Sequence, residues 1–142
     1  MFSLSANTID VVKLLEEVKD DSAGAIVLFL GTVRNHNEHG VVSGIYYEAY
    51  IRMAEEAMAE IEAEALKRWN LKKFAGIHRI GDLEIGEVSV AIAVSSEHRA
   101  EAFEAGKYAI DRIKREVPIW KKEMMRGIKD GIWKHGTVVG RS

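Results

Sequence analysis

The chain of 142 residues contains no cysteine and a single proline. Without cysteine it can form neither a disulfide nor a thiolate zinc site, and it has no cysteine nucleophile. This absence fits a protein of the reducing cytoplasm, which is the location we predict. With one proline and no low-complexity tract, the sequence also lacks the composition of a long disordered segment.

Long apolar runs are missing as well. The longest, residues 25–30, has the length of a strand and falls short of the ~18 apolar residues that a membrane helix needs. The N-terminus lacks the charged start and the apolar stretch of a signal peptide. A length of 142 residues suits one domain, residues 1–142, that can bury a core of its own.

An excess of either charge is absent too. Lysine and arginine total 20 against 22 aspartates and glutamates, which gives a formal net charge of −2. This balance argues against a dedicated nucleic-acid-binding protein, which is usually basic. It leaves room for a local pocket that binds a phosphate or a carboxylate.

The spacing of apolar residues predicts three helices and five strands. The helices are expected over residues 8–19, 52–69 and 98–117, and the strands over residues 23–34, 45–50, 74–80, 88–95 and 119–123. Residues 35–44 are expected to form a loop and residues 81–86 a turn. This order predicts an α+β fold with helices packed on a mostly antiparallel sheet, and the nearest general pattern is ferredoxin-like.

Polar groups that a plain scaffold does not need gather at four places: Thr32–Arg34, residues 95–99, Lys114, and residues 120–123. In residues 95–99 a strand meets a helix start, where free N–H groups, His98 and Arg99 can hold an anion. The alternative is a serine helix cap with exposed polar neighbours, which is more common. Arg34 ends a strand beside a glycine-bearing loop, where functional residues often lie, but taken alone it is more readily explained as an ordinary surface arginine.

Lys114 lies on the rim of an apolar helix face. At 100° per residue it falls 40° from Ile110, while Phe103 falls 20° away on the same side. A lysine beside apolar surface suits nucleophilic or acid–base work. The alternative is a lysine whose stem covers the core and whose ammonium stays in water.

Lys121 and Lys122 are neighbours in a predicted strand, so their side chains should point to opposite faces. Only one of them can face a shared pocket, and Glu123 should share the face of Lys121. The five histidines are dispersed, without the spacing of a metal-binding motif. We therefore predict no metal and no cofactor.

Several stretches together resemble the large, catalytic subunit of molybdopterin synthase. They are FLGTVRNHN (29–37), YYEAY (46–50), HRIGDLEIGE (78–87), VAIAVSSEHRAEAFEAGKYAIDRIK (90–114) and VPIWKKE (117–123). The resemblance runs from about residue 23 to residue 123, and its specificity lies in the order of the stretches rather than in any one of them.

The resemblance implies a fold of the α/β-hammerhead type and a sulfurtransferase. The family enzyme is a heterotetramer in which a homodimer of large subunits binds two small ubiquitin-like subunits. Each small subunit is a sulfur carrier that ends in a Gly-Gly thiocarboxylate. Two sulfurs pass to precursor Z, a cyclic pyranopterin monophosphate, and form the dithiolene of molybdopterin for molybdenum cofactor biosynthesis. Because the sulfur arrives on the partner, a chain without cysteine is compatible with this chemistry.

The resemblance also implies the site. Lys114 and Lys121 match the two catalytic lysines, whereas Arg34, His98 and Arg99 match basic residues that bind the anionic substrate in one site. The contact segments map onto Thr32, Val33, Arg34, Lys121, Lys122 and Glu123. Residues 124–142 are expected to be a mobile tail that contacts the small subunit, with Trp120, Met124, Met125 and Trp133 as interface anchors.

Two other functions remain open on the residues alone. One is a non-catalytic, anion-binding α+β module that dimerises. The other is an unrelated acid–base enzyme that acts on a phosphorylated metabolite through His98 and Lys114. A binding module has no need for two lysines at the ends of strands and helices, which favours an enzyme. A small partner ending in Gly-Gly and encoded nearby would favour the sulfurtransferase over the unrelated enzyme.

Overall fold

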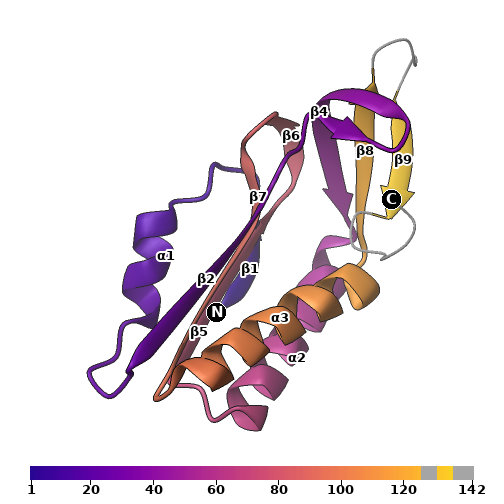
Figure 1. Cartoon of the computed structure of the whole chain (residues 1–142). Helices are drawn as coiled ribbons and strands as arrows, with labels where there is room; N and C mark the ends of the chain where they lie inside the picture. The colour runs from indigo at the N-terminus through magenta and orange to yellow at the C-terminus, as the bar shows by residue number, and fades with distance from the viewer. Residues whose placement is uncertain (126–130, 136–142) are drawn as a thin grey trace.

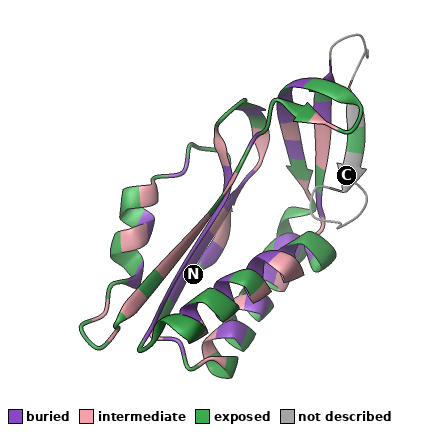
Figure 2. Ribbon diagram, in the orientation of Figure 1, coloured by how far each residue is buried: buried purple, intermediate pink, exposed green. Residues whose placement is uncertain are grey.

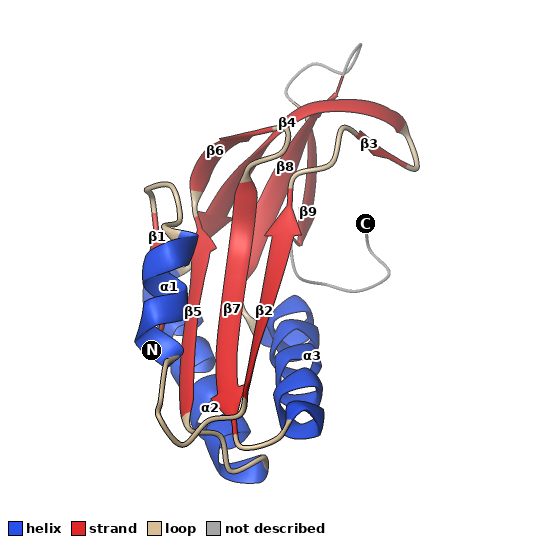
Figure 3. Cartoon of the chain, turned by 60° about the vertical axis from the view of Figure 1, so that its left-hand side comes forward, coloured by secondary structure: helices blue, strands red, loops and turns tan. Residues whose placement is uncertain are grey.

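The computed structural model describes residues 1–125 and 131–135, which form three helices and nine strands (Figures 1 and 3). The helices are α1 (Val11–Val18), α2 (Ile51–Arg68) and α3 (Arg99–Glu116). The strands are β1 (Phe2–Ser5), β2 (Ala25–Thr32), β3 (His36–Asn37), β4 (Gly40–Ala49), β5 (Lys73–Arg79), β6 (Gly81–Glu84), β7 (Val88–Ser96), β8 (Ile119–Met125) and β9 (Ile132–His135).

A four-stranded sheet in the order β1-β5-β7-β2 forms the centre of the molecule. Helix α1 covers one face, whereas α2 and α3 cover the other (Figure 1). Strand β7 serves both faces because its side chains alternate: Val90 and Ile92 join the core under α2 and α3, and Ala91 and Ala93 join the core under α1. This explains why β7 is buried almost throughout (Figure 2) and reads as a continuous apolar run.

A second sheet stands at one end of the first (Figure 1). Its order is β3-β4-β8-β9, and β6 also pairs with β4. Strand β4 is ten residues long and pairs antiparallel with β8, with Tyr47 opposite Lys121 and Ile45 opposite Glu123. The connections from β2 to β4, from β5 to β7, and from α3 to β8 all pass through this junction of the two sheets.

The predicted α+β class is confirmed, with helices on mostly antiparallel sheets; among the described strands only β1 and β5 pair in parallel. The assignment of residues 35–44 to a loop and of residues 81–86 to a turn was wrong in part, because these segments contribute β3, β6 and the start of β4. These segments are polar and rich in glycine, and their strand form depends on pairing with β4 and β8 rather than on their own apolar pattern.

The predicted tail, residues 124–142, is in part strand. Met124 and Met125 complete β8, and β9 pairs with β8 so that Trp133 lies opposite Lys122. The prediction of a mobile tail otherwise falls on residues 126–130 and 136–142, which lie outside the described part of the chain. Within residues 1–125 and 131–135, no helix is long and apolar enough to cross a membrane.

Strand β2 forms an edge of the four-stranded sheet, with β7 as its one partner among the described strands. Ile26 and Leu30 are exposed by 42% and 38% on this strand, and Phe103 of α3, the helix that packs over β2, is exposed by 64%. The strand carries neither a charge nor a proline, which are the usual protections of an exposed edge. An unprotected apolar edge of eight residues is typical of a surface that another strand covers.

Candidate functional site

The end of β2 lies where the two sheets meet. The N–H of Val33 donates to the carbonyl oxygen of Glu87 (3.0 Å), and the N–H of Gly86 donates to the carbonyl oxygen of Val33 (2.9 Å). Val33 is buried, whereas Thr32 and Arg34 on either side are exposed. A fixed Val33 therefore presents Arg34 to solvent from a rigid backbone.

Lys114 lies in the last turn of α3, at the same end of the four-stranded sheet. Its neighbours Ile113 and Val117 are buried, while Lys114 itself is exposed. The side chain thus starts from the rim of the apolar face, as the helical spacing predicts. Helix α3 ends two residues later, at Glu116, because Pro118 cannot continue a helix.

Strand β8 points Lys121 and Lys122 in opposite directions, as predicted. Lys121 and Glu123 share the face of the buried Ile119, and Glu123 is itself buried. Lys122 turns outward, and its ammonium lies 5.0 Å from the centre of the Trp133 ring in a cation–π contact. Of the two lysines, Lys121 is therefore the one that faces the junction.

A buried pair, His78 and Tyr47, lies at the same junction of the sheets, and the sequence patterns did not single it out. Their rings lie 5.0 Å apart in an edge-to-face arrangement at 78°. Tyr47 lies directly opposite Lys121 in the sheet. Burial raises the pKa of Tyr47, a hydrogen bond with Ser89 opposes this rise, and the negative charge of Glu123 adds to it. A histidine in an apolar strand was the available signal.

The His78 ring is neutral. Burial lowers its pKa to about 4, a hydrogen bond to the Arg79 carbonyl oxygen opposes that fall, and the positive charge of Lys114 adds to it. The pKa of His78 thus depends on Lys114, and the ring contact joins it to Tyr47. Lys114 and Lys121 therefore approach the same buried pair from α3 and β8.

The low pKa of His78 predicts an acid-sensitive fold. Near pH 7 the ring is neutral in both states, but as the pH falls from 6.5 toward 4 the unfolded chain takes up a proton that the folded chain excludes. The free energy of unfolding should fall by about 3 kcal/mol over this range. Urea titrations at several pH values measure this slope, and His78→Gln should flatten it; an equal slope in both proteins would contradict the assignment.

His98 and Arg99 lie at the opposite end of the four-stranded sheet. In the antiparallel register Ala25 pairs with Ser96 and Thr32 with Val88, so β2 ends where β7 begins. Eight residues of β-strand span roughly 26 Å, and this distance separates Arg34 from His98 and Arg99 within one chain. The expectation that these three residues form one anion site is therefore wrong for a single chain.

The start of α3 also differs from a serine-capped helix. Ser95 and Ser96 are buried members of β7, and the residue before α3 is His98, whose side chain makes no capping hydrogen bond. The hydroxyl of Ser96 instead donates to the carbonyl oxygen of His98. His98 and Arg99 are both exposed, so their side chains are available to an anion or to another chain.

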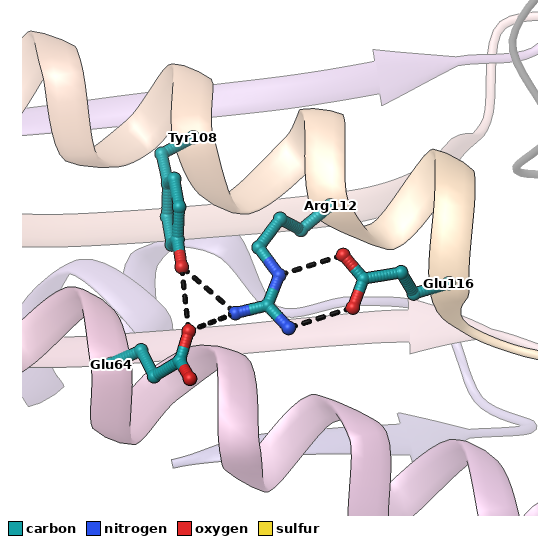
Figure 4. Close-up of polar contacts among 4 residues, drawn as sticks. All are labelled: Glu64, Tyr108, Arg112 and Glu116. Atoms are coloured by element: carbon teal, nitrogen blue, oxygen red, sulfur yellow. Dashed lines mark hydrogen bonds and ion pairs between the residues drawn. The ribbon is translucent and has the colours of Figure 1, made fainter.

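Polar contacts between α2 and α3 fix the helix that carries Lys114 (Figure 4). Arg112 binds both carboxylate oxygens of Glu116 (2.7 and 2.8 Å) and also pairs with Glu64 of α2, which accepts a hydrogen bond from Tyr108 (2.8 Å). The hydrogen bonds to Glu116 raise the pKa of Arg112 above its ordinary value, burial opposes this rise, and a hydrogen bond to Tyr108 adds to it. Such a network holds the last two turns of α3 against α2.

In the part of the chain that the structure describes, no three histidine, aspartate or glutamate side chains come close enough together to hold a metal ion. The candidate site is thus built from lysines, an arginine and a buried aromatic pair.

Comparisons with known proteins agree with this architecture. The model of the MoaE protein family matches residues 4–116. The molybdopterin synthase catalytic subunit of Thermoplasma volcanium is 45% identical over 130 residues, which are 92% of this chain and 94% of the relative. The corresponding protein of Bacillus subtilis is 46% identical over 87% of this chain and 78% of its own length.

The crystal structure of molybdopterin synthase from Staphylococcus aureus superposes with a TM-score of 0.87 at 39% identity and covers 94% of this chain and 96% of that one. Family model, relatives and structure agree over most of the chain, and the chain therefore belongs to the MoaE family of molybdopterin synthase catalytic subunits.

Proposed function

We propose that this chain transfers sulfur from the thiocarboxylated C-terminus of a small ubiquitin-like subunit to precursor Z, and so makes the dithiolene of molybdopterin. The observation that carries the proposal is the placement of Lys114 and Lys121 around one buried pair, Tyr47 and His78, at the junction of the sheets. Two cations beside an uncharged buried wall suit a reaction whose substrates and intermediates are anionic.

Each site residue has a role in this proposal. Lys114, exposed at the end of α3, polarises the thiocarboxylate carbonyl or moves a proton there. Lys121, on the inner face of β8, assists proton transfer or opening of the cyclic phosphate. Arg34 binds the phosphate, and the backbone at Thr32 and Val33 lines its approach. The buried carboxylate of Glu123 shares the strand face of Lys121 and balances its charge.

We further propose that His98 and Arg99 reach this site from a second copy of the chain. The proposal follows from the register, which places them roughly 26 Å from Arg34 in the same chain. If the β2 edges of two copies pair antiparallel about a twofold axis, the end of one β2 lies beside the start of the other. Arg34 of one copy then lies near the helix start of its partner, and the exposed Ile26 and Leu30 are covered.

The small subunit is proposed to approach the outer face of the second sheet. Trp120, Lys122 and Met124 of β8 point outward there, and Trp133 of β9 packs edge-to-face against Tyr46 at 6.2 Å. Exposed tryptophan and methionine side chains are typical anchors of protein interfaces. Met125, which we also expected as an anchor, is buried and belongs to the core instead.

The test is reconstitution. The chain is mixed with a thiocarboxylated small subunit and precursor Z, and molybdopterin is measured after oxidation to a fluorescent derivative. Product that depends on all three components is expected. A small subunit that ends in an ordinary carboxylate is the matched control, because it lacks the sulfur to be transferred. Absence of product from the complete mixture would overturn the proposed function.

A further inference from the structure

His78 sits at the end of β5 that reaches the junction of the sheets. It pairs with Val90, and its side chain points to the face covered by α2 and α3, where α3 ends. Only 3% of the residue is exposed. Burying an imidazole in this position costs desolvation free energy. An apolar side chain of similar size, like that of Phe74 earlier on the same face, would fill the space without this cost, so the presence of a histidine suggests a function.

The hydrogen bonding of His78 fixes its tautomer. Nδ1 lies 2.7 Å from the carbonyl oxygen of Arg79. A carbonyl oxygen can only accept, so Nδ1 carries the hydrogen. In the neutral ring Nε2 is then left with a lone pair, and it can accept a hydrogen bond.

The groups around His78 carry the charges of the proposed site. Tyr47 contacts the ring at 5.0 Å and lies opposite Lys121, while the charge of Lys114 acts on the imidazole from α3. The negative charge of Glu123 acts on Tyr47 and raises the pKa of its hydroxyl. A protonated imidazole here would be a third cation beside two lysines, whereas a neutral one is an acceptor that an ammonium group can use.

We propose that His78 is a positioning residue for sulfur transfer, whose Nε2 accepts a hydrogen bond from the ammonium group of Lys114 and holds it toward the substrate. The need for such a device follows from the exposure of Lys114, because a free lysine side chain samples many rotamers. Tyr47 packs edge-to-face against the ring and lies opposite Lys121 on the neighbouring strand. This inference rests on the proposed function, since it assigns His78 a task within that reaction.

Three substitutions distinguish the role of Nδ1 of His78 from that of Nε2. His78→Gln places an amide oxygen near the position of Nε2 and keeps the acceptor for Lys114. His78→Asn places its amide near Nδ1 and keeps only the bond to the Arg79 carbonyl. His78→Phe keeps the ring volume and removes both. Each variant is assayed for kcat and KM with precursor Z, and its stability is measured by urea unfolding.

Positioning of Lys114 predicts that His78→Gln keeps kcat within about threefold of the unsubstituted protein, while His78→Asn and His78→Phe lose about tenfold or more in kcat with little change in KM. Equal activity of all three variants, or activity kept by Asn and lost by Gln, would overturn the inference. If Phe fails to fold, the Gln and Asn pair still decides. An inactive unsubstituted protein would instead refute the proposed function itself.

Discussion

Lys114→Ala is expected to reduce molybdopterin formation by about 100-fold or more, the usual range for loss of a group that moves a proton or stabilises charge in the transition state. The fold should survive, because Lys114 is exposed and its buried neighbours Ile113 and Val117 remain in place. The measurement is product formed per catalytic subunit under single-turnover conditions, together with circular dichroism and urea unfolding.

Lys13→Ala is the matched control. Lys13 is also an exposed helical lysine, but it lies on α1, on the opposite face of the four-stranded sheet. Its replacement should leave activity unchanged and alter the free energy of unfolding by no more than about 0.5 kcal/mol. Full activity of Lys114→Ala would remove this lysine from the mechanism. Loss of the fold would show instead that its stem supports the core.

Mixing two inactive variants is expected to restore activity. Arg34→Ala and Arg99→Ala should each abolish most product formation alone, because each removes a cation from every site. In a mixed dimer, one site combines both substitutions and the other combines none. Random exchange of subunits should therefore recover about a quarter of the unsubstituted activity. The variants are unfolded together, refolded and assayed beside each variant treated alone.

Recovery requires that the two residues meet across a dimer. If they served one chain, the mixture would stay as inactive as its components, and this result would refute the shared site.

Leu30→Lys tests the proposed β2 contact by itself, since an added charge on the strand edge opposes pairing. Light scattering should show a monomer for Leu30→Lys and a dimer for Val12→Lys, which adds the same charge at an exposed position on α1.

The helices and the central strands were predictable from the sequence because their apolar spacing is set by burial. The patterns of β7, alternating between Val90, Ala91 and Ile92, and of α3, with Ile110 and Ile113 on one face, follow directly from the two cores. Strands β1, β3 and β6 were not predictable in this way. They are two to four residues long; β1 and β6 gain their strand form from partners far along the chain, and β3 gains its form from a tight hairpin with the start of β4.

The candidate site was predictable only in part, for a related reason. The rim position of Lys114 and the opposite faces of Lys121 and Lys122 are local properties of a helix and a strand, and the structure has both. The distance between Arg34 and His98 depends on the register of β2 against β7, which no spacing within either segment reveals. The contact between Tyr47 and His78 joins separate strands and was equally hidden.

Helix α3 carries Arg99 at its first residue and Lys114 near its last, so a single rigid rod of 18 residues holds cations at both of its ends. In the proposed dimer these cations serve different sites, and the rod sets the spacing between the two active centres. One inserted residue would turn Lys114 by about 100° relative to Arg99 and move it about 1.5 Å along the axis. Natural length variation should therefore accumulate in loops such as residues 19–24, while α3 tolerates substitution but not insertion or deletion.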